Sequence, residues 1–474
     1  MQYSVVQKKE VNKTATLRFD AEYFEPKYLK IIEMIEKKSK DFISLDQLGL
    51  KIDASAFYPA LEPYYNEGNL PFIRVQDTDM KIDYDNCIKI PKTITQNPDF
   101  STLKITNLGD IVITKGGSIA RVGFIKKKSA VCRDLIFLNA SILPNFEYKF
   151  LYIYCLSYIY KDLLIRSSSM TAQPHLTITL VKDIPIYNPK QDFKIFMASL
   201  FDKIIELDEL INSNYKNAEK ILLNELGIQN WQPKHELSYV KNFSDVSISN
   251  RYDAEYFQPK YDEIIEKIKL YPNGWDTIGN LFDQNRDSFI VKKDNKYKYI
   301  EIGSINTSNG EITFEEIQGN DLPANAKIKL HTSDILISKV RTYRGAVAVV
   351  ENSDYIGSGA FTVLHEKLNS QINKETLYTF FKLKPILDLT LKYNTGTSYP
   401  TITDEDILNM PIPIFKQNIQ NEIREKIQEA KKLQTQSKQL LEIAKRGVEI
   451  AIEENEEVAT IWIHEQFSKI GVTI

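Results

Sequence analysis

The stretch Arg18-Phe-Asp-Ala-Glu-Tyr-Phe-Glu-Pro-Lys-Tyr28 recurs as Arg251-Tyr-Asp-Ala-Glu-Tyr-Phe-Gln-Pro-Lys-Tyr261, 233 residues further along the chain. Nine of the eleven positions are identical, and the two differences are the mild exchanges Phe to Tyr and Glu to Gln. Chance does not produce such a pair in a chain of 474 residues. The chain is therefore one module written twice, and its function has to require two copies.

Each copy opens with the signal of an amphipathic helix. Pro26 and Pro259 suit a first helical position, where the missing N–H costs nothing. Apolar residues follow in each copy at the i, i+3, i+4, i+7 spacing of one helix face: Tyr28, Ile31, Ile32 and Ile35, then Tyr261, Ile264, Ile265 and Ile268.

Strand patterns follow in the same order in both copies. Residues 71–76 and 298–303 alternate like half-buried strands. Residues 109–115 and 333–339 are short buried-type strands that run into loops with arginine and glycine. The polar loops 167–176 and 394–401 then lead into the proline-marked strands expected over 182–186 and 408–412. This parallel order over about 230 residues predicts two mixed modules of helices and strands.

Each copy closes with a long helix whose apolar residues recur every three or four positions, as in a coiled coil. The first seam is Phe193, Phe196, Leu200, Ile204, Leu207, Ile211, Tyr215, Ala218, Leu222 and Leu226. The second is Ile419, Ile423, Ile427, Ala430, Leu433, Leu440 and Ala444. Gly227 is a suitable stop for the first helix. Because a whole module returns the chain between them, we expect the helices to pair antiparallel. The alternative is that each helix only covers its own module.

These patterns predict an α/β (α+β) fold with domain boundaries at 1–190, 191–227 (first long helix), 228–415 and 416–474 (second long helix and tail). No apolar run approaches the roughly 20 residues that cross a bilayer, and the N-terminus lacks the apolar core of a signal peptide. Three cysteines without a CxxC pair favour the reducing cytoplasm. The net charge is −3, but residues 114–133 carry six basic and no acidic residues, so a local basic surface is possible.

The order module, helix, module, helix resembles the DNA specificity (S) subunit of type I restriction–modification systems over essentially the whole chain. The likeness is carried by the paired Asp-Ala-Glu-Tyr-Phe openings, the strands of Gly-Asp-Ile-Val-Ile type with basic glycine loops, and Gln173-Pro-His-Leu-Thr177 before Asp183-Ile-Pro-Ile186. The resemblance implies two target recognition domains, each reading half of a bipartite double-stranded DNA target. It also implies that the paired helices space these domains and dock two methyltransferase (modification) subunits, which restriction endonuclease subunits join. The S subunit itself is non-catalytic and needs no cofactor.

Arginine reads guanine through two hydrogen bonds, and Asn and Gln suit adenine, so the polar loops hold the candidate DNA contacts. They are Lys115, Gly117, Arg121, Arg133, Gln173, His175, Lys339, Arg341, Arg344, Asn394, Ser398 and Tyr399. The alternative is that these loops are hairpin turns with a solvated rim. The repeated Asp-Ala-Glu-Tyr-Phe segments are poor readers, because two half-sites generally differ. We expect them to form a shared frame where each module meets the helices and a modification subunit.

Motifs of catalysis are weak in this chain. There is no GxxxxGK[ST] loop for nucleotide hydrolysis. Asn97-Pro-Asp-Phe100 resembles an amino-methyltransferase motif but has Asp99 in place of proline, and we interpret it as a turn. Asp99 with Glu147 and Lys149 makes only a forced nuclease pattern, and the five histidines and three cysteines predict no metal site. A different hypothesis remains, a tandem protein-binding scaffold assembled through its coiled coil.

Overall fold

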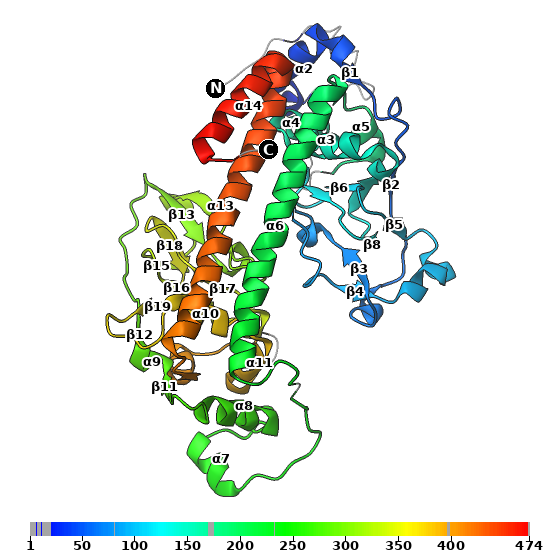
Figure 1. The fold of residues 1–474 in the computed structure, drawn as a ribbon. Helices are drawn as coiled ribbons and strands as arrows, with labels where there is room; N and C mark the ends of the chain where they lie inside the picture. Colours follow the sequence, from blue (N-terminus) through cyan, green and yellow to red (C-terminus); the bar gives the residue numbers. More distant parts are fainter. Residues whose placement is uncertain are drawn as a thin grey trace. The chain divides into compact units, whose positions relative to one another are not determined.

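The computed structural model describes Val6, Val11 and residues 20–79, 81–168, 175–231, 233–395 and 399–472. The chain divides into two compact units. Unit 1 consists of residues 1–208 and 435–474, and unit 2 of residues 209–434. Each unit therefore contains one of the two sequence modules together with part of both long helices, which are labelled α6 and α13 in Figure 1.

The described residues of unit 1 form three small sheets. A two-stranded sheet pairs β1 (Phe42–Ile43) with β10 (Ile186–Tyr187). An antiparallel sheet has the order β2 (Ile52–Ala54), β9 (Leu135–Leu138), β6 (Ile111–Thr114), β7 (Val122–Phe124). A mixed sheet has the order β4 (Lys89–Ile90), β3 (Leu70–Ile73), β8 (Ser129–Val131), β5 (Lys104–Thr106), with β3 and β8 parallel.

Unit 2 repeats these sheets strand for strand. Its two-stranded sheet pairs β11 (Trp275–Thr277) with β20 (Pro411–Pro413). Its antiparallel sheet has the order β12 (Phe282–Gln284), β19 (Phe361–Glu366), β16 (Ile335–Ser338), β17 (Val347–Val349). Its mixed sheet has the order β14 (Glu315–Gln318), β13 (Lys296–Ile300), β18 (Tyr355–Ser358), β15 (Ala326–Lys329), again with its inner pair parallel. The duplication that the sequence predicts is confirmed down to strand direction.

The helices that open the modules begin where the prolines predict. They are α2 (Pro26–Lys37) and α8 (Pro259–Lys269), and each buries its Tyr-Ile-Ile face. In unit 1 the 3₁₀ turn η1 (Ala21–Phe24) precedes α2, and the sheets are followed by α3 (Asn145–Leu156), α4 (Tyr158–Ser167) and α5 (Ile178–Lys182). In unit 2 the remaining helices of the module are α7 (Phe243–Ser249), α9 (Ile278–Leu281), α10 (Lys374–Phe380), α11 (Lys384–Tyr393) and α12 (Asp404–Asn409).

In the core of unit 1, helix α3 packs between a sheet and the long helix α6. Every residue from Phe150 to Leu156 is buried, so this part of the helix is enclosed on all sides, as expected for an apolar segment surrounded by other elements. Phe124 of β7 lies 5.1 Å from Tyr152 of α3 and 4.8 Å from Phe201 of α6, between ring centroids. The rings of β7, α3 and α6 thus form one aromatic core in unit 1.

The strands expected over 182–186 and 408–412 are shorter than predicted. Lys182 ends α5, and Leu408 lies in α12, so each strand begins only after the helix. Thr177 and Thr403 cap these short helices, because their hydroxyl oxygens accept hydrogen bonds from the amides of Leu180 and Asp406. A local cap therefore outweighs the strand pattern at both places.

The long helices are α6 (Gln191–Glu225) and α13 (Gln417–Glu453), and α14 (Glu456–Ile470) follows the second. Gly227 has a φ of 64°, so the predicted stop of α6 is confirmed. In unit 2, Tyr215 and Leu222 of α6 belong to the same core as Ile423 and Ile427 of α13. That core also includes sheet residues, so here each helix covers the module as well.

In unit 1 the contact lies near the middle of both helices, because Ser437 of α13 donates to Asp208 of α6. The contacts inside the two units thus agree with an antiparallel pair. The coiled-coil packing of side chains remains a prediction. Leu200, Ile204, Leu207, Ile211, Ile423, Ile427 and Leu440 are buried, and Ile419 and Leu433 are partly buried against the core of unit 2. Phe196 instead packs on His464 of α14, at 5.2 Å between ring centroids. None of the helices in the described ranges is long and apolar enough to span a bilayer.

Candidate nucleic-acid interface

The loop between β6 and β7 is preformed by its own hydrogen bonds. The buried Thr114 hydroxyl donates to the carbonyl of Ser118 and accepts from the amide of Arg121 at 3.0 Å. Gly117 and Ala120 have φ values of 72° and 63°, so both residues have a left-handed backbone conformation. Gly117 is exposed at the tip, and Arg121 is half-buried at the loop's end.

Two other loops of unit 1 are joined to this one through Lys115. The amide of Leu176 donates to the Lys115 carbonyl at 2.8 Å, and the Lys115 amide donates to the Asp134 carbonyl at 3.0 Å. His175 and Arg133, the neighbours of Leu176 and Asp134, are both exposed. The structure therefore brings Lys115, Gly117, Arg121, Arg133 and His175 together. Gln173, also a candidate, lies outside the described residues.

The same two hydrogen bonds recur in unit 2. The amide of Ile402 donates to the Lys339 carbonyl at 2.9 Å, and the Lys339 amide donates to the Ala360 carbonyl at 2.8 Å. Lys339 follows β16 as Lys115 follows β6. Each module thus holds three loops together at the same end of its antiparallel sheet, although the residues at the tips differ.

In the candidate interface of unit 2, the backbone of Arg341 is strained. Its φ is 51°, in the left-handed region, and its amide donates to the Pro400 carbonyl at 2.8 Å. Its guanidinium lies 5.2 Å from the ring centroid of Tyr399, a side chain that is 70% exposed. Arg344 is exposed at the end of the 3₁₀ turn η10 (Thr342–Arg344), which the left-handed Gly345 closes. A non-glycine residue in this region costs about 1 kcal/mol or more, so the loop context holds it there.

Two candidates of unit 2 have structural partners. The ammonium of Lys339 lies 3.3 Å from the Asp404 carboxylate, which also accepts from the Thr362 hydroxyl at 2.6 Å. Burial raises the pKa of Asp404, but the hydrogen bond from Thr362 and the charge of Lys339 together bring that pKa below its ordinary value. The carbonyl of Asn394 accepts from Arg251 at 3.0 Å. Ser398 lies outside the described residues.

The repeated Asp-Ala-Glu-Tyr-Phe segments brace the helices that lead into these loops. The Arg166 guanidinium of α4 donates to the Tyr23 carbonyl at 3.0 Å and lies 3.7 Å from that ring's centroid. The Lys392 ammonium of α11 makes the matching pair with Tyr256, at 2.9 Å and 4.3 Å. The segments are thus part of each module's internal frame. Arg166 and Lys392, which lie 226 residues apart, are the signal in the sequence for this contact.

Two cations of the basic run 114–133 have partners away from the loops. Lys126 lies 3.9 Å from the buried carboxylate of Asp208, which Lys81 approaches to 2.5 Å. The Lys127 ammonium lies 5.4 Å from the ring centroid of Tyr84. Positive charge at the interface of unit 1 therefore comes from Lys115, Arg121 and Arg133.

The residues that weakly resemble methyltransferase and nuclease motifs have structural roles. Asn97 caps the 3₁₀ turn η6 (Pro98–Phe100) by accepting from the Asp99 amide, so the interpretation as a turn is confirmed. Glu147 accepts from Lys194 at 2.6 Å, and Lys149 lies 2.6 Å from Asp202. Both Glu147 and Lys149 thus hold α3 against α6.

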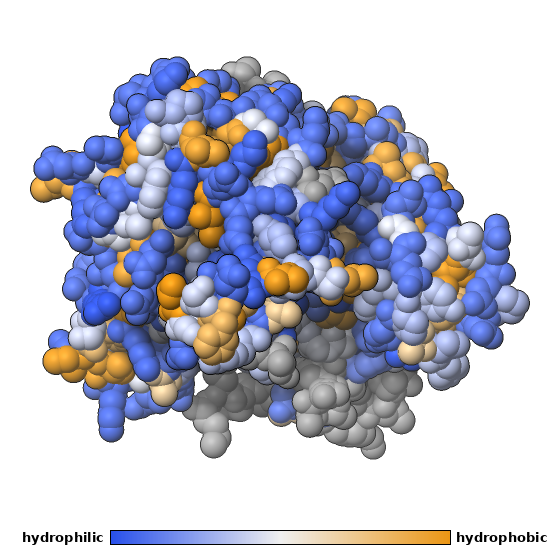
Figure 2. All heavy atoms as spheres, turned by 90° about the horizontal axis from the view of Figure 1, so that it is seen from below, coloured by the Kyte–Doolittle hydropathy of each residue, from blue (hydrophilic) through white to orange (hydrophobic). Residues whose placement is uncertain are grey.

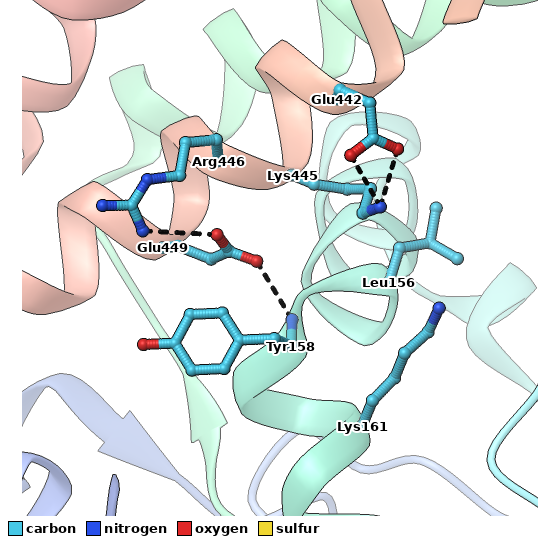
Figure 3. Close-up of a pocket in the computed structure, with 7 residues that line it drawn as sticks. All are labelled: Leu156, Tyr158, Lys161, Glu442, Lys445, Arg446 and Glu449. Carbon is cyan, nitrogen blue, oxygen red and sulfur yellow. Dashed lines mark hydrogen bonds and ion pairs between the residues drawn. The ribbon is translucent and has the colours of Figure 1, made fainter. Parts of the chain in front are cut away.

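A small cavity of about 230 Å³ in unit 1 lies between α4 and α13 (Figure 3). Its polar groups bond to one another: Glu449 accepts from the Tyr158 amide at 3.0 Å, and Glu442 accepts from Lys445 at 2.8 Å. Burial lowers the pKa of Lys161 at its edge, and the nearby Lys445 lowers it further. The Tyr158–Glu449 bond attaches α4 to α13, and we assign these polar groups a structural role.

Comparison with known proteins connects this geometry to a family. The type I restriction enzyme MjaIX specificity subunit of Methanocaldococcus jannaschii is 27% identical over 165 residues, which are 33% of this chain and 36% of that relative's length. The S subunit of a type I restriction-modification system from M. genitalium aligns over 91% of this chain and 96% of its own, with 14% identity and a TM-score of 0.34. The HsdS subunit from Thermoanaerobacter tengcongensis aligns over 86% and 97%, with 15% identity and a TM-score of 0.26.

The family model for the type I restriction modification DNA specificity domain matches this chain twice, over residues 37–220 and again over residues 272–444. The two matches fall on the two modules and their long helices. Together they cover most of the chain, and the family is one that recognises DNA. The chain belongs to the type I restriction modification DNA specificity family.

Proposed function

We propose that this chain reads a bipartite double-stranded DNA target, one half-site per module, and directs methyltransferase and endonuclease subunits to it. One observation carries the proposal. The same hydrogen bonds hold three loops together in each module, through Lys115 and Lys339, while the residues at the loop tips differ. A shared frame with different tips is what reading two different half-sites requires.

The tips suit DNA chemically. Arginines reach guanine or phosphate, and Tyr399 and His175 add polar edges. In unit 2 we propose Arg341 and Arg344 as the main readers, and in unit 1 Arg121 and Arg133. Lys339 and Asn394 support the loops from behind, since both have partners inside unit 2.

We assign residues 1–190 and 228–415 to the two recognition domains, and 191–227 and 416–474 to the spacer helices with the C-terminal tail. A helix of 35 residues, as in α6, extends about 52 Å at 1.5 Å per residue. That is longer than one turn of DNA, about 34–36 Å. Two readers on such a spacer bind jointly, because the second contact becomes intramolecular. The helices are also our proposed docking site for two methyltransferase subunits, in the cytoplasm, and the chain itself catalyses no step.

The test is selection from a randomised duplex library, with the methyltransferase partner present. We expect one motif in two parts, separated by unread base pairs. In the same assay Arg341→Ala relaxes the preference at one position of one half-site and leaves the other half-site intact. A library that returns no two-part motif contradicts the proposal, and a uniform loss for Arg341→Ala makes that residue a phosphate contact.

The second candidate is the protein-binding scaffold. On the face drawn in Figure 2, the hydrophobic residues among those that the structure describes lie in small groups between hydrophilic ones, and these groups form no broad apolar surface. Salt separates the two functions, because the affinity of a DNA reader falls log-linearly with salt concentration. Binding that is insensitive to salt favours the scaffold.

A further inference from the structure

The loop that follows β2 in unit 1 is anchored on both sides of an exposed tyrosine. The buried Ser55 hydroxyl donates to the Val131 carbonyl at 2.7 Å. Phe57 is 5% exposed and packs on Phe100 at 5.6 Å, and Leu61 is also buried. Between these anchors the side chain of Tyr58 is 90% exposed. Because Tyr58 precedes a proline, its backbone is restricted to extended conformations. The ring is thus held in solvent by a fixed support.

The equivalent loop of unit 2, after β12, also has a phenylalanine with an aromatic partner, although this ring is only partly buried. Phe289 packs on Tyr297 at 5.5 Å between ring centroids, and the Tyr297 hydroxyl accepts from the Lys292 amide at 2.8 Å. The next side chain, Ile290, is 88% exposed. An anchored phenylalanine followed by an exposed apolar residue therefore occurs at the same place in both modules. Single exposed apolar residues are common on proteins, but a matched pair in two copies calls for a common cause.

Both loops begin beside the candidate DNA interface. In unit 1, Arg133 donates to the Phe57 carbonyl at 3.3 Å, and the next residue accepts from the Lys115 amide. In unit 2, the Asn285 amide just after β12 donates to the Val363 carbonyl of β19 at 2.8 Å, and Ala360 just before β19 accepts from the Lys339 amide. The loops of Tyr58 and Ile290 thus leave from the same cluster as the polar loops.

We propose that Tyr58 and Ile290 are specificity-determining residues that make apolar contacts with DNA bases, one in each half-site. The inference rests on the proposed function and extends it to a loop that the polar-residue patterns do not reveal. Neither side chain carries a charge for phosphate. Apolar side chains read the thymine methyl group in the major groove, or insert between base steps in the minor groove. An aromatic tip in one module and an aliphatic tip in the other suits two half-sites of different sequence.

The test is library selection with the chain in complex with its methyltransferase partner, comparing wild type, Tyr58→Ala, Tyr58→Phe and Ile290→Ala. We expect Tyr58→Ala to reduce the preference about tenfold at one or two adjacent positions of one half-site. Tyr58→Phe keeps the preference, since the ring remains, and Ile290→Ala relaxes the other half-site. The slope of log affinity against log salt stays unchanged in all three variants, because no phosphate contact is lost.

The matched controls are Leu108→Ala and Leu368→Ala. These side chains are 58% and 105% exposed, and they follow or precede strands at the opposite end of the antiparallel sheets. Both controls keep the wild-type preferences. Unchanged preferences in Tyr58→Ala and Ile290→Ala, with a two-part motif in wild type, overturn this inference alone. A uniform loss of affinity with a reduced salt slope also overturns it. A wild-type chain without any two-part motif overturns the proposed function, and this inference with it.

Discussion

Glu219 of α6 provides a test of the structure of unit 2 that does not involve DNA. Burial raises the pKa of this carboxyl from 4.5 to about 7, although the charges of Lys382 and Lys216 lower it. Tyr378 of α10, fully buried, is the other titratable group whose pKa this carboxyl influences. The perturbation is Glu219→Gln, which keeps the shape of the side chain and removes its titration.

The direction of the pH dependence follows from which state of the chain binds the proton. Between pH 4.5 and about 7 the folded chain holds the Glu219 proton while the unfolded chain releases it, so the free energy of unfolding falls as pH rises through this window. Above it the carboxylate is charged in both states, and its burial costs about 3 kcal/mol, from about 1.36 kcal/mol per pH unit. Between about pH 5 and pH 8 the advantage of Glu219→Gln over wild type therefore grows by about 2.5 kcal/mol.

The assay is urea denaturation of wild type and variant across this pH range, in a Trp462→Phe background. Trp231 and Trp275, both in unit 2, then report the unfolding of that unit by fluorescence. Glu209→Gln, an exposed position on the same helix, is the control and follows wild type at every pH. Parallel curves for wild type and Glu219→Gln would place the carboxyl in its ordinary range and refute the reasoning.

Three further predictions concern packing. Asp208→Ala removes the acceptor of the Ser437 hydrogen bond at 2.9 Å and the partner of Lys81, whose side chain is 29% exposed. We expect the free energy of unfolding of unit 1, measured by urea denaturation, to fall by about 2–3 kcal/mol. A fall of less than about 0.5 kcal/mol would contradict this. Lys382→Met removes the donor to the Gly345 carbonyl at 2.8 Å, and amide exchange in the turn before Gly345 should rise at least about tenfold, with unit 1 as the unchanged reference. Phe124→Ala empties the aromatic core of unit 1 and should cost about 3–5 kcal/mol, whereas the exposed Leu108→Ala should cost little.

Much of the fold could be predicted because it is written in local patterns. Pro26 and Pro259 begin helices, Gly227 ends one, and the strands expected near 71–76 and 298–303 occupy equivalent places in equivalent sheets. Strand and helix periodicity depend on which face of an element is buried, and that information lies within some ten residues. Because the two halves are repeats, an element predicted in one half is also expected at the equivalent place in the other.

The partners of the charged residues could not be predicted in the same way. Lys126 belongs to a basic run that suggests a DNA surface, yet it lies near Asp208 on α6. Lys339 follows its strand as a candidate reader, yet Asp404 binds it from 65 residues away. A charge pattern shows how many charges are present but not which of them meet, because pairing depends on how distant segments come together.

By itself the sequence determined that the chain is a doubled module with two long helices, since repetition and periodicity are properties of neighbouring residues. Only the tertiary structure decided which side chains gather at the interface. The backbone hydrogen bonds of Lys115 join it to residues 19 and 61 positions away, and those of Lys339 join it to residues 21 and 63 positions away. With the Arg133 bond to the Phe57 carbonyl, they bring the loop of Tyr58 to the loops of Arg133 and His175. Such contacts form when sheets close, and no local pattern encodes them.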